Sequence, residues 1–278
     1  MKTALLAEEA AGAFRQRALS AQRRRQSLKI GLGIGFPLAM LLLWQAAVWL
    51  GAIDGRFFPA PSKIAIAAAA LLADAHERAI LAQDIVASGQ RVVVSFCLGS
   101  LLGIIAGITM ALWLPLRFAL GPIISATYPT PKLAMFPLFI VIFGLGDASK
   151  IALITLGVFF MTCMSTLSGV MYYNPIYNDV AKAFCFPAWT HWLKVVVPAA
   201  LPAIITGLKL GLGQALILVV STEMVSGQDG LGHFIWESWQ ILNISRMFIG
   251  LTIAALAGGA AMLVGEFIER RLTPWAVH

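Results

Sequence analysis

Three ionisable side chains lie inside stretches of the sequence that are otherwise apolar: Lys132, Lys209 and Glu223. On insertion scales, a charge at the centre of a membrane-spanning helix costs about 2.5–3.5 kcal/mol, so such residues usually face a bundle interior or a watery path. The two ammonium groups could attract a small anion to that path. The sequence therefore predicts that these three residues line a translocation path.

The spacing of these residues bears on how they could act together. Lys209 and Glu223 are 14 residues apart, which places them within about 40° of one helix face and about 21 Å apart along the axis. They are too far apart to pair but could line one cavity at two depths. The alternative is that each lies near a membrane end and extends its charge to the surface. Around Lys132, Pro129 and Pro131 expose backbone groups that protein or water must satisfy, which favours a cavity.

Motifs for nucleotide or metal chemistry are absent from the sequence. No lysine follows a glycine, so there is no G-x-x-x-x-G-K nucleotide loop, and the four histidines have no metal-ligand spacing. An intramembrane enzyme would need a histidine beside a serine such as Ser95, Ser100 or Ser165, and none accompanies them. A secondary transporter would need inverted repeats and coupling carboxylates near mid-membrane. These two classes are the weaker alternatives, and we expect no catalytic, metal-binding or cofactor-binding residues.

Composition identifies the solvent of most of these side chains. The chain has 278 residues, of which 59% are hydrophobic and 12% charged, whereas soluble domains carry about 45–50% apolar and about 25% charged residues. So little charge cannot cover a soluble globule, which excludes soluble enzymes, disordered chains and disulfide-stapled secreted domains. The three cysteines have no metal-ligand spacing and are interpreted as small apolar residues. An all-α polytopic membrane protein remains.

Six stretches are long and apolar enough to span a membrane, since about 20 such residues are needed. The third is expected to be broken at Pro129, Pro131 and Lys132. The expected spans are 30–53, 92–114, 118–146, 151–172, 199–226 and 247–268. A basic cytoplasmic tail (1–29) precedes this transmembrane domain (30–272), and a short tail (273–278) follows it. The first apolar run is too long for the core of a signal peptide, about 7–15 residues, and suits a spanning helix.

The segment 54–90 differs from the spans because it carries several charges, and its apolar content is mostly alanine. We expect an interfacial or extramembrane hairpin there, with a short surface helix beginning near Pro61. The second span carries Gly99, Gly103 and Gly107, four residues apart, which predicts a groove for close packing of another helix.

The distribution of basic residues predicts the orientation. Twelve of the 20 Lys and Arg residues fall on the side of the two termini, six fall on the other side, and Lys132 and Lys209 lie between. Because basic residues are enriched in cytoplasmic loops, both termini should be cytoplasmic. The Arg23–Arg25 cluster is interpreted as a topology anchor, and lipid or nucleic-acid binding is the weaker alternative.

A long connection between the fourth and fifth spans, residues 174–198, is predicted to form two short helices. Asn174 and Pro175 suit a helix start, and Asp179 suits the first turn, where the helix dipole favours an acid. Apolar residues at helical spacing then make one face, a turn follows around Cys185, and a second helix runs to Pro198. Such an apolar face outside the bilayer needs a protein partner or the membrane surface.

The run from Asp179 to Pro202 resembles the EAA loop of the permeases of ATP-binding-cassette (ABC) importers. Asp179 stands for the glutamate, Val180 and Ala181 for the alanines, Cys185 for the glycine and Pro198 for the proline. Further similarity lies in YPTPKLAMFPLFIVIFGLGDASKI (128–151), STEMVSGQDGLG (221–232), FPAPSKI (58–64) and ERRLTPW (269–275). Together these motifs resemble the nitrate/sulfonate/taurine branch of type I importer permeases.

The resemblance implies a fold, partners and a role for the loop. It implies a six-helix type I importer transmembrane domain in a bacterial inner membrane, and it involves no nucleic acid. The partners would be a second permease subunit, two cytosolic ATPase subunits that bind the ATP and Mg²⁺, and an extracytoplasmic solute-binding protein. The solute would be a small anion such as a sulfonate, taurine or nitrate. The residues contacting the ATPase would be Asp179, Val180, Ala181, Ala183, Phe184, Cys185 and Pro198, although Val180 and Cys185 depart from the pattern.

Overall fold

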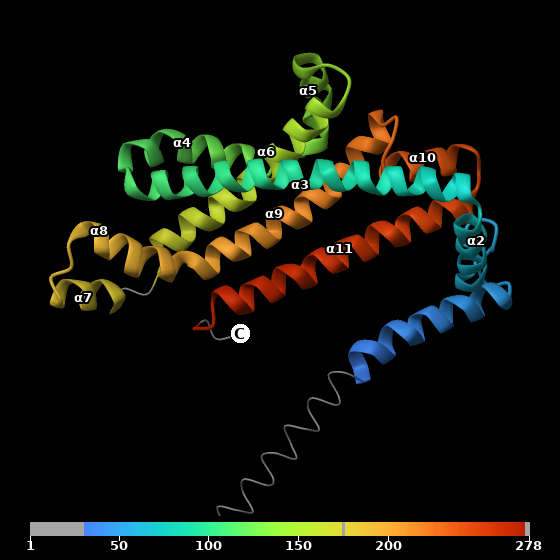
Figure 1. Ribbon diagram of the computed structural model, residues 1–278, viewed down its shortest axis with the longest axis horizontal. Coiled ribbons are helices and arrows are strands. Elements are labelled where there is room, and N and C mark those ends of the chain that lie inside the picture. Colours follow the sequence, from blue (N-terminus) through green and yellow to red (C-terminus); the bar gives the residue numbers. More distant parts are fainter. Residues whose placement is uncertain (1–30, 174–175, 276–278) are drawn as a thin grey trace, which may run out of the picture. The chain divides into compact units, whose positions relative to one another are not determined.

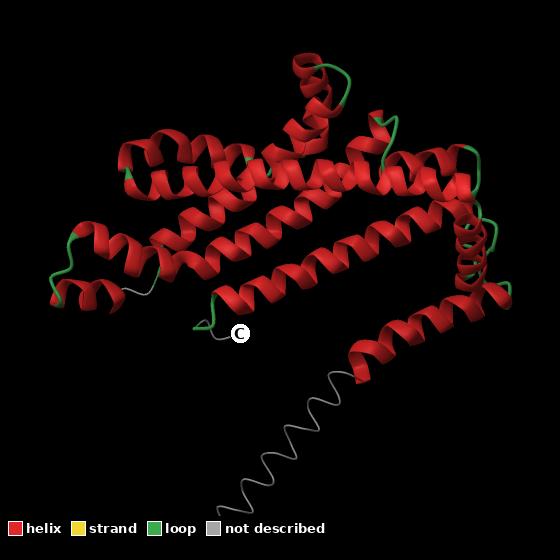
Figure 2. Cartoon of the chain, in the orientation of Figure 1, coloured by secondary structure: helices red, strands yellow, loops and turns green. Residues whose placement is uncertain are grey.

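The computed structural model describes residues 31–173 and 176–275 of the chain. All regular secondary structure in these residues is helical (Figures 1 and 2). The chain divides into two compact units, Met1–Ile66 and Ala67–His278. Within the described part, five helices are long and apolar enough to cross a membrane, and the count is six when one bent helix pair is taken as a single span. The expected fold class, an all-α polytopic membrane protein with six spans, is confirmed.

The first unit holds one long apolar helix, Gly31–Trp49, and the beginning of α2 (Pro61–Ala73). The long helix ends at Trp49, before the expected end at residue 53, and Gly51 then turns the chain with a φ of +72°. The Gln45 side chain donates to Ser62 Oγ at 2.9 Å and accepts from Ser62 N at 3.0 Å. These bonds tie the end of the apolar helix to the first turn of α2.

The second unit contains the helices that form the bundle. They are α3 (Ala75–Leu112), α4 (Leu114–Thr127), α5 (Phe136–Phe143), α6 (Asp147–Met171), α7 (Ile176–Ala183), α8 (Ala188–His191), α9 (Val197–Ser226), α10 (Leu231–Gln240) and α11 (Ile244–Leu272). A 3-10 turn, Lys132–Met135, precedes α5, and a π-helical segment, Trp192–Val196, joins α8 to α9.

Helix α3 corrects the expectation of a hairpin over residues 54–90. Asp74 caps its first turn by accepting hydrogen bonds from His76 N and Glu77 N, at 2.8 and 3.2 Å. The helix then continues without a break into the expected second span. The polar residues of this stretch are compatible with one continuous helix because Asp84 and Arg91 are buried and hydrogen-bonded to other parts of the chain.

The fifth span also begins earlier than expected. Pro198 does not end a separate helix, because helical structure runs from Trp189 to Ser226 through the π-helical segment. Pro198 lies two residues after the π-helical segment, and its ring and missing N–H account for the departure from regular α-helical geometry at that place. The second short helix of the loop, α8, is therefore continuous with the spanning helix α9.

The third span is broken as expected. Helix α4 and the Lys132–Phe143 segment meet at an angle of 99°. The break falls at residues 128–131, which contain Pro129 and Pro131. Because α5 has only eight residues, it is too short to cross a bilayer by itself.

Helix α6 lies between α3 and α9 and carries much of the bundle core. Ile154 and Val158 on α6 pack with Val92 of α3 and Val219 of α9. Helix α3 approaches α6 closely at its glycines: a Cβ built at Gly103 would lie 2.8 Å from Thr162 Cβ. The predicted glycine groove of α3 therefore does receive another helix, and that helix is α6.

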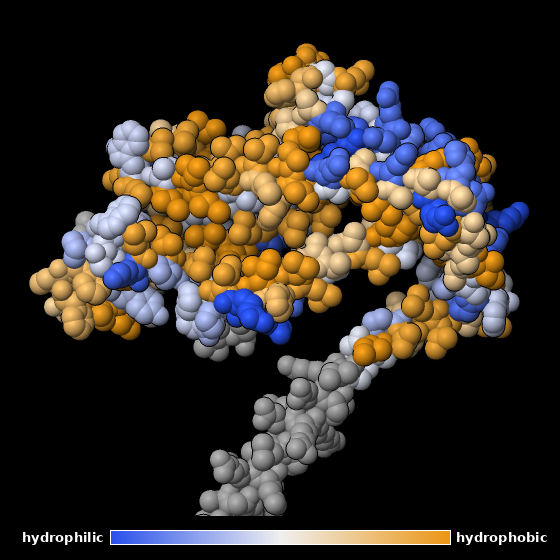
Figure 3. All heavy atoms as spheres, in the orientation of Figure 1, coloured by the Kyte–Doolittle hydropathy of each residue, from blue (hydrophilic) through white to orange (hydrophobic). Residues whose placement is uncertain are grey.

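Apolar side chains cover the outer faces of the bundle. Orange, hydrophobic atoms extend over the sides of α3, α4, α9 and α11 in Figure 3. Ile217 and Leu256, for example, are 65% and 68% exposed. Hydrophilic atoms gather mainly around α10 and the base of α5 (Figure 3). Such an apolar exterior is stable when hydrocarbon is the solvent.

Candidate functional site

The connection between α6 and α9 forms a short helix pair with an exposed apolar face. Ile176, Val180 and Phe184 recur along α7 and its last turn, and their exposed fractions are 61%, 47% and 69%. Asp179 lies in the first turn of α7 and is exposed. Ala181, by contrast, is only 4% exposed and faces the rest of the chain. The predicted helix start at Asn174 and Pro175 lies outside the described residues.

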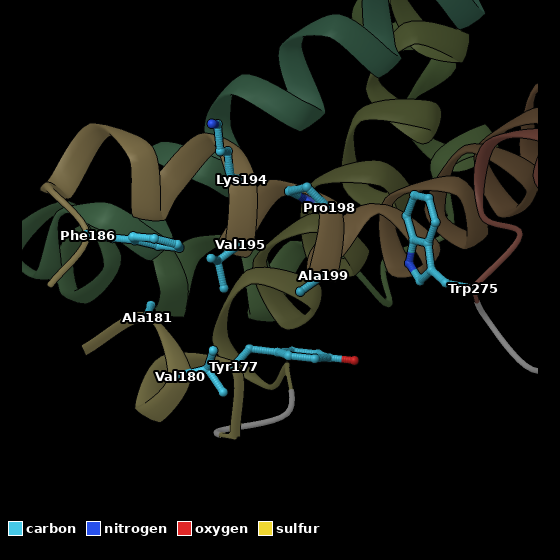
Figure 4. A pocket seen from close by; sticks show the side chains of 9 residues that line it. All are labelled: Tyr177, Val180, Ala181, Phe186, Lys194, Val195, Pro198, Ala199 and Trp275. Carbon is cyan, nitrogen blue, oxygen red and sulfur yellow. The ribbon is translucent and has the colours of Figure 1, made fainter. Parts of the chain in front are cut away.

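A pocket of about 310 Å³ lies behind α7 (Figure 4). Figure 4 shows Ala181, Val180 and Tyr177 on the α7 side, and Val195, Pro198 and Ala199 on the helix opposite. The remaining lining residues are Phe186, Lys194 and Trp275. The loop, the start of α9 and the end of the chain therefore meet around one mostly apolar cavity.

The turn after α7 has the geometry of a Schellman helix ending. Phe186 N donates to Ala181 O at 3.1 Å, and Cys185 between them has a φ of +50°. This is the left-handed position at which glycine is preferred, because a Cβ is unfavourable there. Cys185 thus occupies the position that a glycine usually takes in this motif. The rings of Phe184 and Phe186 stack across it, with centroids 6.1 Å apart.

A partly buried cluster of charges lies at the other end of the bundle. It comprises Arg91 on α3, Asp147 and Lys150 on α6, Glu223 on α9 and Asp229 in the loop after α9, and is called the charge cluster below. Helix α9 connects the two sites: Pro198 lines the pocket behind α7 and Glu223 belongs to the charge cluster, so about 38 Å of helix separates them.

Arg91 holds the charge cluster together. Its guanidinium lies 2.7 Å from Glu223 Oε1, 2.7 Å from Asp147 Oδ1 and 2.5 Å from Asp229 Oδ1. The side chains of Arg91 and Glu223 are only 4% and 0% exposed. Glu223 also accepts hydrogen bonds from Ser88 Oγ at 2.8 Å and from Gly232 N at 3.0 Å. Glu223 is therefore buried and fully hydrogen-bonded inside the protein.

The other two predicted path residues are also paired, each at a different place. Lys209 Nζ lies 2.7 Å from Glu269 Oε2 of α11. Lys132 Nζ donates to the carbonyl oxygens of Thr127, Tyr128 and Thr130, at 3.0, 2.7 and 2.8 Å. It thereby satisfies backbone groups that the break after α4 leaves open. The three residues do not form one cluster, and their role in a path stays a prediction.

Sequence reasoning found Glu223 but missed its partner. Arg91 stands directly before the expected second span (92–114) and is one of the six basic residues that the sequence places on the side opposite the termini. The signal that could have found it is the cost of burying Glu223, which requires a cation. Among the described residues, no group of three or more His, Cys, Asp and Glu side chains could hold a metal ion.

The fold and these two sites define a membrane permease domain with a solvent-exposed helix loop. Residues 99–277 match the family described as binding-protein-dependent transport system inner membrane component. The chain belongs to this family, and within it to the branch whose relatives include taurine, aliphatic sulfonate and nitrate permeases.

Two relatives are similar over almost their whole length. The taurine transport system permease protein TauC of Escherichia coli (strain K12) is 33% identical over 90% of this chain and 91% of its own. The putative aliphatic sulfonates transport permease protein SsuC of Bacillus subtilis (strain 168) is 30% identical over 98% of both. The nitrate import permease protein NrtB of Leptolyngbya laminosa is 30% identical over 69% of this chain and 68% of its own.

The fold also resembles that of a solved transporter. A chain of the inward-facing MetNI methionine ABC transporter superposes with a TM-score of 0.63 and 19% identity. The similarity covers 72% of this chain and 99% of that one. This likeness confirms the architecture of an ABC-importer transmembrane domain.

Proposed function

We propose that this permease imports a small sulfonate-, taurine- or nitrate-like solute, delivered by an extracytoplasmic binding protein, and that two separate ATPase subunits drive it. The observation that carries the proposal is the exposed apolar face of α7 in a chain of this family. Val180 and Phe184 expose apolar surface beside Asp179, outside the spans. A groove of a cytosolic ATPase subunit would cover that surface. ATP and Mg²⁺ would be bound by that subunit and not by this chain.

The position of the loop supports a mechanism of coupling. Helix α7 packs around the pocket that Pro198 and Ala199 line from the start of α9. The far end of α9 carries Glu223, which is bonded to Arg91 of α3. A displacement of α7 by a closing ATPase pair would therefore reach the opposite end of the bundle through one continuous helix. Closure of the two ATPase subunits would in this way switch the translocation path from outward-facing to inward-facing.

We assign the residues that touch the ATPase by their exposure. Val180 and Phe184 are exposed and Ala181 is buried, so we assign the contact to the first two. Ala181 and Pro198 instead line the pocket behind α7, and Cys185 sets the turn after α7 through its positive φ. Ala183 is exposed at the end of α7 and can join the contact.

The remaining partners follow from the same proposal. A second permease subunit, most simply another copy of this chain, would complete the path. Both termini would be cytoplasmic in a bacterial inner membrane, on the side of α7. Trp275 lines the pocket behind α7, which supports placing the end of the chain on the same side as the loop.

A charge placed on the α7 face tests this assignment. Phe184→Asp should leave membrane insertion unchanged but abolish co-purification of a subunit that carries a G-x-x-x-x-G-K loop, because a buried carboxylate costs several kcal/mol. Leu242→Asp is the matched control: Leu242 is 74% exposed on the turn between α10 and α11. It should leave the ATPase subunit bound. Equal recovery of that subunit with wild type and Phe184→Asp would overturn the proposal.

A further inference from the structure

A pocket of about 360 Å³ opens beside the charge cluster, where the start of α6 meets the loop after α9. It lies at the end of the bundle opposite α7. Its charged and polar wall residues are Arg91, Asp147, Lys150, Ser226, Gln228 and Asp229. None of these residues belongs to the loop between α6 and α9. The volume suits a solute of a few heavy atoms.

The pocket holds one cation with hydrogen-bonding capacity to offer. Lys150 lines the wall, yet its side chain is only 3% exposed. Its ammonium lies 3.7 Å from Asp147 Oδ1, which is longer than a hydrogen bond. That ion pair therefore leaves the N–H groups of Lys150 to other acceptors. A sulfonate or carboxylate in the pocket would accept from them.

The Arg91 guanidinium differs from the Lys150 ammonium because it is already engaged. Its nitrogens donate to Asp147 Oδ1, to Glu223 Oε1, and to both the side chain and the carbonyl oxygen of Asp229. An anion entering the pocket would have to displace one of these carboxylates. Lys150 is therefore the cation that an incoming acid group would meet.

Two carboxylates of the same wall remain open to solvent. Asp147 and Asp229 both use Oδ1 for Arg91, and their side chains are 60% and 52% exposed. Glu223 sits behind Arg91 and balances its charge. The wall around the cavity therefore carries Lys150 against two carboxylates. Such a balance disfavours a bare anion and favours a solute that brings an ammonium group of its own.

We propose that this pocket binds a small zwitterion, with its acid group at Lys150 and its ammonium group at Asp147 and Asp229. The proposal rests on the proposed import function and narrows its substrate class. An amino-sulfonate such as taurine fits both halves of the wall. Ethanesulfonate or nitrate satisfies Lys150 alone and leaves the carboxylates facing an anion.

Protection of an introduced thiol tests this pocket. Ser226→Cys places a thiol on the wall, in a chain whose exposed cysteines are replaced by Cys97→Ser and Cys185→Gly. The probes are taurine, ethanesulfonate and ethylamine, which carry both groups, the acid alone and the amine alone. The full assembly in membrane vesicles is labelled with an uncharged thiosulfonate reagent. Saturating taurine should slow labelling at least about tenfold, and the other two less than about twofold.

Two controls separate a pocket effect from a general one. A thiol at Gln240→Cys, exposed at the end of α10 and outside the pocket, should label at the same rate with and without taurine. Adding Lys150→Met to Ser226→Cys should abolish protection by taurine, whereas Lys63→Met, on exposed α2, should keep it. The comparison of the three solutes needs no change at Lys150, so a folding defect of that variant cannot decide the outcome.

Each result decides between the alternatives. Protection by ethanesulfonate equal to that by taurine would overturn the zwitterion assignment, and no protection by any solute would overturn the pocket itself. Binding-protein-dependent uptake is measured on the same vesicles. Normal uptake without protection would reject the pocket while leaving the permease function intact, and loss of both would count against the proposed function too.

Discussion

Arg91 joins four segments that are far apart in the sequence: α3, the start of α6, the end of α9 and the loop that follows it. Its charge and that of Glu223 are withdrawn from solvent almost completely. A buried ion pair of this kind adds little net stability, but loss of one partner leaves an uncompensated charge. The pair therefore specifies how these segments meet.

Removal of Arg91 and Glu223 together should cost less stability than the sum of the two single removals. We expect Arg91→Met to lower the free energy of unfolding by about 3–5 kcal/mol, because Glu223 stays buried without its cation. Arg91→Met combined with Glu223→Gln should lose clearly less than the two single effects together. Thermal unfolding of the purified protein in detergent measures the loss for Arg91→Met, for Glu223→Gln and for the double variant. Additive losses would show that the two side chains do not act as a pair.

Cys185 allows an unusual stabilising substitution. With a φ of +50°, it should be improved by Cys185→Gly, by about 1 kcal/mol, because glycine lacks the Cβ that disfavours this conformation. Cys97→Gly is the opposite control, since Cys97 lies inside helix α3, where glycine costs about 0.5–1 kcal/mol. Limited proteolysis of the loop and thermal unfolding measure the gain in stability expected for Cys185→Gly and the loss expected for Cys97→Gly. A loss of stability with Cys185→Gly would contradict the observed turn.

Individual residues were predictable to different degrees. The depth of Glu223 in an apolar run marked it as buried or functional, because charge in hydrocarbon is costly. Its pairing with Arg91 was not predictable, since the two lie on different helices and no local period relates them. Ala181 was assigned to the partner contact by resemblance, and only the turn of α7 shows that it faces inward.

Helix packing in this bundle depends on the absence of side chains at particular positions. Gly103 lets α3 approach α6, since a Cβ there would come within 2.8 Å of Thr162 Cβ and 2.9 Å of the Phe159 carbonyl oxygen. Gly89 lies on the same helix with no atom within 4 Å of such a Cβ. The two glycines therefore make a matched pair.

Gly103→Leu should separate α3 from α6, whereas Gly89→Leu should not. Overpacking of a tight core typically costs about 1–3 kcal/mol, and leucine otherwise favours a helix more than glycine does. We expect a lowered unfolding temperature for Gly103→Leu and an unchanged or raised one for Gly89→Leu. Similar losses at both positions would indicate that the contact with α6 carries no special weight.

Among the helices, the sequence predicted where a span is interrupted better than it predicted where a helix begins and ends. Pro129 and Pro131 predicted the interruption of the third span, because proline lacks the donor that a helix needs. The polar start of α3 was expected to lie outside the span, yet it continues the same helix because its charges are satisfied by other segments. The π-helical segment Trp192–Val196 ends just before Pro198, and the proline ring disfavours a regular α-helical turn over the residues that precede it.

The molecule as a whole connects an apolar loop at one end with buried charges at the other. Its charge deficit identified a membrane protein, and its family membership identifies the inner-membrane component of a binding-protein-dependent transport system. The solute itself could not be predicted from composition or spacing, because it depends on pockets that several helices build together. The charge-lined pocket beside Lys150 is one such site.

The central claim is that this chain moves its solute only when a separate ATPase subunit hydrolyses ATP. Uptake of labelled taurine into proteoliposomes tests it most directly, with the permease reconstituted either alone or with its ATPase and binding-protein partners. We predict uptake only in the complete assembly, with ATP on the side of α7, and none when Phe184→Asp replaces the wild-type chain. Uptake by the permease alone, driven by a sodium or proton gradient, would contradict the account.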